Sequence, residues 1–118
     1  MNKLTRGMVV DVNLNPVKGS ETGQIRSCVI VTNNTYNARV PVIQVVPFTA
    51  WSEKKARIIT NVEIIPSSRN GCSKKSVVDC LQTRPVDHRA RLVGIRGELE
   101  DSDMAKIDAA LKIVFDLS

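Results

Sequence analysis

Residues 8–32, MVVDVNLNPVKGSETGQIRSCVIVT, contain two strand patterns joined by a polar loop. The first pattern, at 8–14, alternates and is rich in β-branched side chains, and the second, at 28–32, is a continuous apolar run of strand length. Gly19 and Gly23 flank the polar loop and can take positive φ, which allows a tight turn or a close approach to a ligand. The stretch therefore predicts two strands connected by a loop that can carry a site.

The loop and the start of the second strand bring three chemically useful side chains into seven residues: the Ser20 hydroxyl, the Glu21 carboxylate and the Arg26 guanidinium. Arginine offers a planar fork of donors that suits phosphate oxygens. A phosphate-handling site is one interpretation of this pattern. An ordinary hairpin connection with solvated charges is the other.

Short strand patterns continue along the chain. Further strands are predicted at 42–48, 56–60, 62–65, 76–81 and 91–95, and turn-rich pieces such as RPVDHRA at 84–90 separate them. About seven short strands with frequent turns are typical of a small barrel or sandwich.

The C-terminal segment changes to helical spacing. Its apolar residues recur at intervals of three and four, and they are Met104, Ile107, Ala110, Leu111 and Val114. Asp101 or Ser102 is the expected N-cap, with acidic residues in the first turn. We expect a helix over 101–115 that packs its apolar stripe against the barrel, because a helix this short needs tertiary contacts.

Length and composition indicate one domain, since 118 residues suffice for a single modest core. No apolar run approaches the roughly 20 residues of a membrane span, and the N-terminal MNKLTRG lacks the apolar stretch of a secretory signal. Three cysteines without CxxC spacing favour reduced thiols, with Cys28 in the core. We expect a soluble cytoplasmic protein with no membrane partner.

Charge is divided unevenly along the chain. Residues 1–97 hold 15 Lys and Arg against 6 Asp and Glu, a net +9, whereas residues 98–118 hold 2 against 6, a net −4. The basic part predicts a polyanionic partner, either nucleic acid or an acidic protein segment.

Several chemistries find no support in the sequence. It has one histidine, His88, and no zinc-ligand spacing, HExxH, Walker or Rossmann pattern, so neither a metal nor a nucleotide cofactor is expected. A Cys80–His88 nucleophile pair is conceivable, but His88 lies among arginines, where solvated surface is the default. Trp51, near two lysines, either stacks on a base or covers the barrel mouth.

Residues 6–33, RGMVVDVNLNPVKGSETGQIRSCVIVTN, resemble the opening of MazF/PemK-type toxins, in which a strand, NLxPxxGsExxxxRP and an apolar strand follow one another. The similarity continues through VPFT (46–49), NVEI (61–64), SVVDCLQTR (76–84), VDHRARL (86–92) and EDSDMAKIDAALKI (100–113). The resemblance covers nearly the whole chain. It implies a small SH3-like barrel over residues 1–118, with a C-terminal helix, that forms a homodimer.

The resemblance also implies a function: a toxin endoribonuclease that cleaves single-stranded RNA at a short sequence without metal. A cognate antitoxin would neutralise it, and the complex of the two would bind DNA. The products would be a 2′,3′-cyclic phosphate and a 5′-hydroxyl. If the antitoxin covers the basic groove, its binding segment should be acidic and partly disordered.

Carried over onto this chain, the resemblance places the family's arginine on Arg26 and its strand-end threonine on Thr49. Its loop serine and glutamate fall on Ser20 and Glu21. Arg26 would stabilise the reacting phosphate, and Thr49 and Ser20 would orient it and relay protons. Glu21 is either the base or a loop-shaping group that pairs with Arg26 or a backbone N–H. Expected RNA contacts are Lys18, Thr22, Trp51, Gln82 and Arg84.

Three positions depart from the family pattern: Ser27 replaces a proline, Asn61 a common histidine, and Pro85 interrupts the segment after Gln82. They bear on strand ends and sequence preference. Two alternative functions stay open. One is a gyrase-poisoning toxin on a related barrel, acting by protein contact, and the other is a non-catalytic barrel that binds RNA or an antitoxin.

Overall fold

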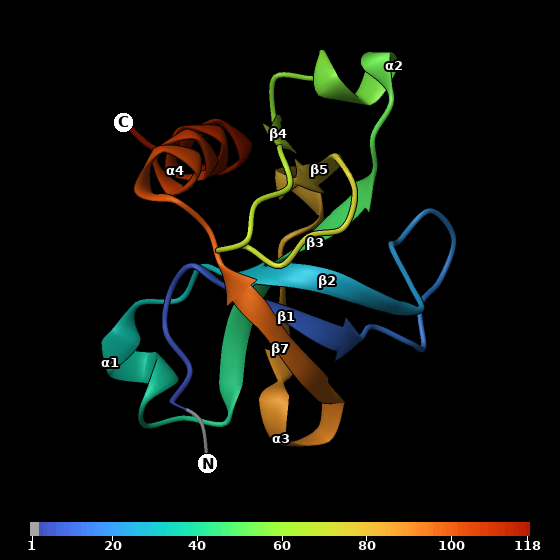
Figure 1. Cartoon of the computed structure of the whole chain (residues 1–118). Coiled ribbons are helices and arrows are strands. Elements are labelled where there is room, and N and C mark those ends of the chain that lie inside the picture. Colours follow the sequence, from blue (N-terminus) through green and yellow to red (C-terminus); the bar gives the residue numbers. More distant parts are fainter. Residues whose placement is uncertain (1–2) are drawn as a thin grey trace.

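The computed structural model describes residues 3–118, in which antiparallel strands form one sheet in the order β4-β5-β3-β2-β1-β7, with β6 paired to β3 (Figure 1). The strands are β1 Met8–Asn13, β2 Ile25–Ile30, β3 Val42–Ala50, β4 Asn61–Ile64, β5 Ser76–Asp79, β6 Arg84–Asp87 and β7 Leu92–Glu98. The helices are α1 Asn34–Asn37, α2 Glu53–Ala56, α3 His88–Arg91, α4 Asp101–Phe115 and the short 3₁₀ helix η1 Cys80–Gln82. The mainly β architecture with a C-terminal helix confirms the expected fold class, although the sheet is not closed.

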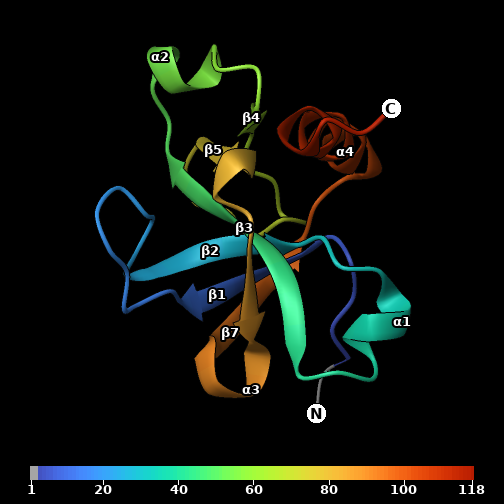
Figure 2. The same cartoon turned by 180° about the vertical axis from the view of Figure 1, so that it is seen from behind.

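Strand β3 joins the two halves of the sheet, one with β1, β2, β6 and β7 and the other with β4 and β5. Its first residues pair with β6, the residues around Val46 pair with β2, and Phe48, Thr49 and Ala50 pair with β5. In Figure 2 this long strand runs from the half that contains β1 and β7 toward α2. The two halves therefore meet where the pairing of β3 changes from β2, at Pro47, to β5, at Phe48.

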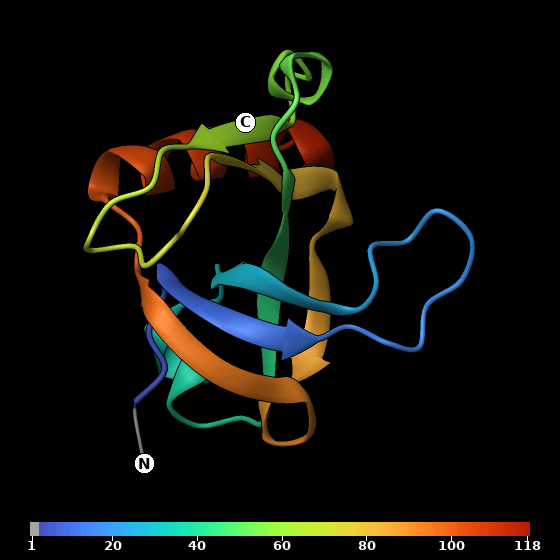
Figure 3. The same cartoon turned by 45° about the vertical axis from the view of Figure 1, so that its right-hand side comes forward.

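The core occupies both faces of the sheet because side chains alternate along each strand. In β1, Val9 belongs to the cluster beneath α4, whereas Val10 and Val12 belong to a second cluster with residues of β2, β3 and β6. Figure 3 shows α4 lying along β4, at the end of the molecule away from α3. Cys28 is fully buried, as expected for a core residue.

The predicted apolar stripe of the terminal helix is confirmed. Met104, Ile107 and Ala110 are buried, and Leu111 and Val114 pack partly buried against the same cluster. The predicted N-cap is wrong: Glu100 occupies that position without a side-chain cap. The Glu100 carbonyl accepts the Met104 N–H at 3.0 Å, and the residue before Glu100, Leu99, is buried.

The predicted strand at 56–60 is wrong. Ser52 caps α2 by accepting the Lys55 N–H at 3.1 Å, so the chain turns as a helix before this segment. Ile58 and Ile59 are exposed, and their apolar character is therefore not the sign of a buried strand.

The segment 84–90, expected to be a turn, contains strand β6 and the start of α3. Pro85 lies opposite Gln44 of β3. Among the described strands, β6 pairs only with β3 and so has a partner on one side. A proline is tolerated in such a strand where its missing N–H would face away from the partner. The count of seven strands thus agrees with the prediction, but its membership differs at these two places.

Within residues 3–118, no helix has both the length and the apolar run needed to cross a membrane.

Candidate functional site

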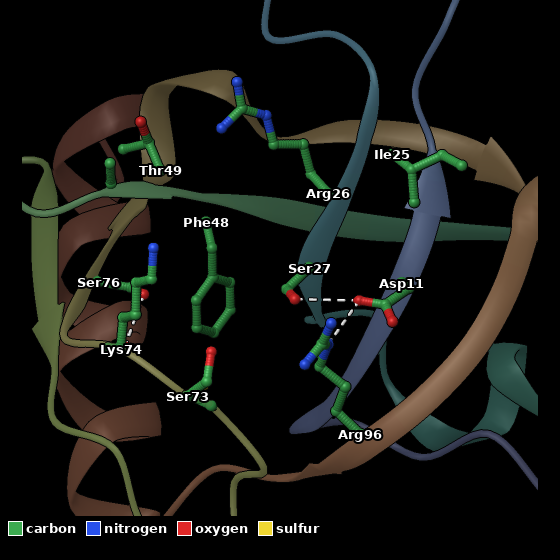
Figure 4. Close-up of a pocket in the computed structure, with 12 residues that line it drawn as sticks. Asp11, Ile25, Arg26, Ser27, Phe48, Thr49, Ser73, Lys74, Ser76 and Arg96 are labelled. Atoms are coloured by element: carbon green, nitrogen blue, oxygen red, sulfur yellow. Dashed lines mark hydrogen bonds and ion pairs between the residues drawn. The ribbon is translucent and has the colours of Figure 1, made fainter.

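A cavity of about 300 Å³ opens between β2, the end of β3, β7 and the segment that precedes β5 (Figure 4). Arg26 and Thr49 both line it, together with Lys74 and Arg96. The structure therefore brings together the two residues that the resemblance placed at the centre of the chemistry. They come from neighbouring strands, β2 and β3.

Arg26 keeps most of its donors available. Its Nε donates to the Gly23 carbonyl at 3.2 Å, which fixes the side chain against the end of the preceding loop. Its two terminal nitrogens make no hydrogen bond or ion pair with any residue of the described part of the chain. In Figure 4 the guanidinium extends toward the Thr49 side of the cavity. A charged fork of this kind can bind two oxygens of one phosphate.

Thr49 receives a hydrogen bond that the sequence analysis missed. Lys55 of α2 donates from Nζ to Thr49 Oγ1 at 3.0 Å and lies 3.4 Å from the Ala50 carbonyl. Ser52 caps α2 shortly after β3 ends, and the short helix places Lys55 within hydrogen-bonding distance of Thr49. A capping serine three residues before a lysine was the only local signal in the sequence.

The loop between β1 and β2, drawn in blue, projects away from the sheet in Figure 3. Its carboxylate, Glu21, accepts the backbone N–H of Lys18 at 2.7 Å, which is one of the loop-shaping roles expected for it. Gly19 has φ +57, as expected. Gly23 does not have positive φ. It is required for space, because a Cβ there would lie 2.7 Å from Val17 Cγ2.

Gln82 ties this loop to η1. Its Oε1 accepts the Thr22 N–H at 3.3 Å, and its Nε2 donates to the Ser20 carbonyl at 3.4 Å. Arg84 donates to the Leu14 carbonyl at 3.0 Å. These contacts hold the base of the loop through side chains that were predicted to bind RNA.

A second cavity, of about 360 Å³, lies between the loop and η1 and includes Glu21, Thr22, Gln82 and Arg84. The predicted site residues are therefore divided between two cavities. Ser20 and Lys18 are not among the residues that line either one. The roles predicted for Ser20 and Glu21 stay predictions.

Trp51 lies outside both cavities and has contacts of its own. Its indole N–H donates to Glu63 Oε2 at 2.7 Å, and the Lys75 ammonium lies 4.1 Å from the ring centroid. One face of the ring is thus in a cation–π contact. Stacking of an RNA base on Trp51 remains a prediction.

Sequence reasoning also missed a polar network in the first cavity. Asp11 Oδ1 accepts from Ser27 Oγ at 3.0 Å and from Arg96 Nε at 2.8 Å. Ser27 is the position where the family pattern has proline, so this departure supplies the hydroxyl. No local pattern could reveal the network, because Asp11 and Arg96 lie 85 residues apart.

The Cys80–His88 pair gains no support. Burial raises the pKa of Cys80 to about 12, which disfavours the thiolate that a nucleophile needs. Cys28, Cys72 and Cys80 are all free thiols. Across residues 3–118, no group of three His, Cys, Asp or Glu side chains is arranged to hold a metal ion.

Known proteins resemble this chain over nearly its full length. The family model described as "PemK-like, MazF-like toxin of type II toxin-antitoxin system" matches residues 5–115. Endoribonuclease EndoA from Bacillus subtilis (strain 168) is 37% identical over 108 residues, which cover 92% of this chain and 90% of the relative.

Two solved structures show the same fold. MazF from Deinococcus radiodurans aligns with a TM-score of 0.85 at 20% identity, covering 99% of this chain and 100% of the other. A mycobacterial endoribonuclease in complex with its cognate antitoxin aligns with a TM-score of 0.77 at 23% identity, covering 98% and 97%. The chain therefore belongs to the PemK-like, MazF-like toxin family of type II toxin–antitoxin systems.

Proposed function

We propose that this protein is a sequence-specific endoribonuclease toxin that cleaves single-stranded RNA and leaves a 2′,3′-cyclic phosphate and a 5′-hydroxyl. The observation that carries the proposal is that Arg26, whose terminal nitrogens have no partner within residues 3–118, and the Thr49 hydroxyl line the same cavity. Family membership and the name of the Bacillus subtilis relative support the same activity.

The reaction requires a base that takes the proton of the attacking RNA 2′-hydroxyl, stabilisation of the charge that develops on the phosphate, and a proton for the departing 5′-oxygen. Arg26 supplies the stabilisation, since an arginine guanidinium keeps its positive charge in proteins. Thr49 contributes a hydroxyl that orients a phosphate oxygen, and Lys55 adds a second positive charge beside it. These cationic donors would stabilise the negative charge that develops on the phosphate without a metal ion.

A cognate antitoxin is the proposed protein partner. Arg26 and Lys74 line the same cavity, so an acidic segment could occupy the surface on which RNA would bind. Such a segment would be partly disordered before binding. A homodimer and a cytoplasmic location complete the proposal, as the family resemblance implies.

The test is to incubate the purified protein with a mixed RNA pool in EDTA and to sequence both new ends. We expect cuts within single-stranded segments that leave 5′-hydroxyl and 2′,3′-cyclic phosphate ends. Loss of cleavage in EDTA, or products with 5′-phosphates, would refute the metal-free reaction. An Arg26→Ala protein, purified identically, controls for a contaminating ribonuclease.

The same assay separates the alternatives. RNA that binds in a salt-dependent manner but stays intact would indicate a non-catalytic barrel. Intact and unbound RNA, together with inhibition of gyrase, would indicate a toxin that acts by protein contact.

A further inference from the structure

Arg96 reaches the cavity because of a bulge in β7. In the pairing of β1 with β7, Val9 lies opposite Gly97 and Val10 lies opposite Ile95, so Arg96 is the extra residue between two consecutive pairs. A bulge of this kind redirects a side chain and is common beside functional sites. In Figure 4 the Arg96 side chain lies at the opposite end of the cavity from Arg26 and Thr49.

Two glycines allow the close backbone packing around Arg96. A Cβ at Gly71, which has φ +68, would lie 2.3 Å from the Arg96 carbonyl oxygen. A Cβ at Gly97 would lie 2.2 Å from the Arg69 carbonyl oxygen. The loop before β5 therefore packs directly against β7, and it brings Ser73 and Lys74 into the wall of the cavity.

Asp11 holds the Arg96 side chain by one edge. The Arg96 Nε donates to Asp11 Oδ1 at 2.8 Å, and Ser27 donates to the same oxygen at 3.0 Å. The two terminal nitrogens of Arg96 make no hydrogen bond or ion pair within residues 3–118. The contact with Asp11 thus restrains the guanidinium and leaves its outer fork of donors facing the cavity.

The two arginines of the cavity differ in whether a carboxylate is paired with them. Arg26 has no carboxylate partner among the described residues, which suits a phosphate. Arg96 is ion-paired with Asp11, whose carboxylate would repel a phosphate placed beside it. An arginine that is already paired suits a neutral ligand with acceptors, and a nucleobase edge is such a ligand.

We propose that Arg96, held by Asp11, is a specificity-determining residue that reads a guanine or a cytosine of the RNA. Guanine presents two adjacent acceptors, N7 and O6, and cytosine presents O2 and N3. In each base a donor group lies next to this pair of acceptors. Adenine and uracil present no two adjacent acceptors on an edge. Bases of single-stranded RNA expose these edges for hydrogen bonding. The inference rests on the proposed function.

The test uses the mixed RNA pool and compares the sequences around the cuts for the wild type, Arg96→Lys and Asp11→Ala. In the wild type, one position at a fixed distance from the cut should be restricted to guanine or cytosine. Since a bidentate base contact discriminates strongly against the wrong base, the preference should fall about fivefold or more in Arg96→Lys. Lysine keeps the charge but loses the fork. Asp11→Ala should also weaken the preference for guanine or cytosine.

The exposed Arg89 of α3, which lies outside the cavity, provides the matched control, and Arg89→Lys should leave the preference unchanged. A thermal unfolding midpoint equal to that of the wild type shows that each variant folds. Replacement of guanine by 7-deazaguanine removes N7, so it should abolish the preference if guanine is read and leave it intact if cytosine is read.

Two results would overturn the inference. One is a wild type without a guanine or cytosine preference at any position. The other is an Arg96→Lys protein that cuts all sequences less while its preference is kept, which would make Arg96 a general contact. If the chain cuts no RNA, the proposed function fails separately. The RNA pool is then separated into a bound and an unbound fraction. If the bound fraction shows no enrichment in guanine or cytosine that depends on Arg96, the inference is refuted.

Discussion

Lys55 Nζ donates a hydrogen bond to Thr49 Oγ1 at 3.0 Å. An ammonium group carries only donors, so the threonine oxygen must be the acceptor in this contact. The hydroxyl proton of Thr49 is therefore free to be donated elsewhere, and Thr49 lines the cavity that contains Arg26. In the proposed reaction, this polarity favours Thr49 as a donor to a phosphate oxygen over Thr49 as the acceptor of the 2′-hydroxyl proton.

Replacing Lys55 by Met should lower the single-turnover rate of RNA cleavage by about tenfold or more, because a hydrogen bond to a charged group contributes about 1.5–3 kcal/mol. Rates measured at saturating protein isolate the chemical step from binding. Lys54→Met is the matched control, since Lys54 is an exposed neighbour in α2 that does not line the cavity. Equal rate losses in both variants would show only a general effect of surface charge.

Replacing Arg26 by Ala should lower the cleavage rate by about 10²–10³, the range found when one donor to a developing negative charge is removed. RNA affinity should fall much less, because the fork contributes mainly when charge develops on the phosphate. Single-turnover rates and equilibrium binding to an RNA with a 2′-deoxy nucleotide at the cut separate the two quantities. Equal losses in rate and affinity would make Arg26 a binding residue.

The sequence predicted the parts of the fold that depend on periodic burial. The strand patterns at 8–14 and 28–32 and the helical stripe around Ile107 correspond to β1, β2 and α4. The prediction was wrong where one local contact decides the structure: the Ser52 cap makes α2 precede a segment read as a strand. It was also wrong where a proline-containing strand, β6, pairs with β3.

The candidate site shows the same division. Arg26 and Thr49 could be named from the resemblance, and the structure places both in one cavity. Lys55 and Arg96 could not be named, because their roles depend on the geometry of a helix cap and of a bulge. Such contacts join residues through the fold, and the serine three residues before Lys55 is the only local signal of them in the sequence.

The unfolding free energy should fall as the pH rises above about 9. Burial raises the pKa of Cys28 and of Cys80 from 9.0 to about 12, so the folded state keeps protons that the unfolded state releases. The stability that these thiols contribute is fully present below pH 9 and is lost as the pH rises toward 12. Between pH 9 and 10 the two thiols together should cost about 1–2 kcal/mol.

Urea unfolding at a series of pH values measures this dependence. A protein with Cys28→Ala and Cys80→Ala, which is expected to be less stable at every pH, should show a flatter decline between pH 9 and 10. An identical decline in this variant would assign the loss of stability to other groups, such as lysine and tyrosine side chains, and would contradict the prediction.

Replacing Glu21 by Gln should change the cleavage rate by less than about threefold. The Glu21 carboxylate accepts the Lys18 N–H at 2.7 Å, and a glutamine carbonyl can accept the same hydrogen bond, so the loop should keep its shape. A pH–rate profile with the same form as that of the wild type would show that Glu21 does not move the reacting proton. The measurement distinguishes the two roles because a general base contributes about 10²–10⁴ to the rate. A loss of that size in Glu21→Gln, with RNA affinity kept, would establish Glu21 as the base and would mean that the loop moves toward Arg26 when RNA binds.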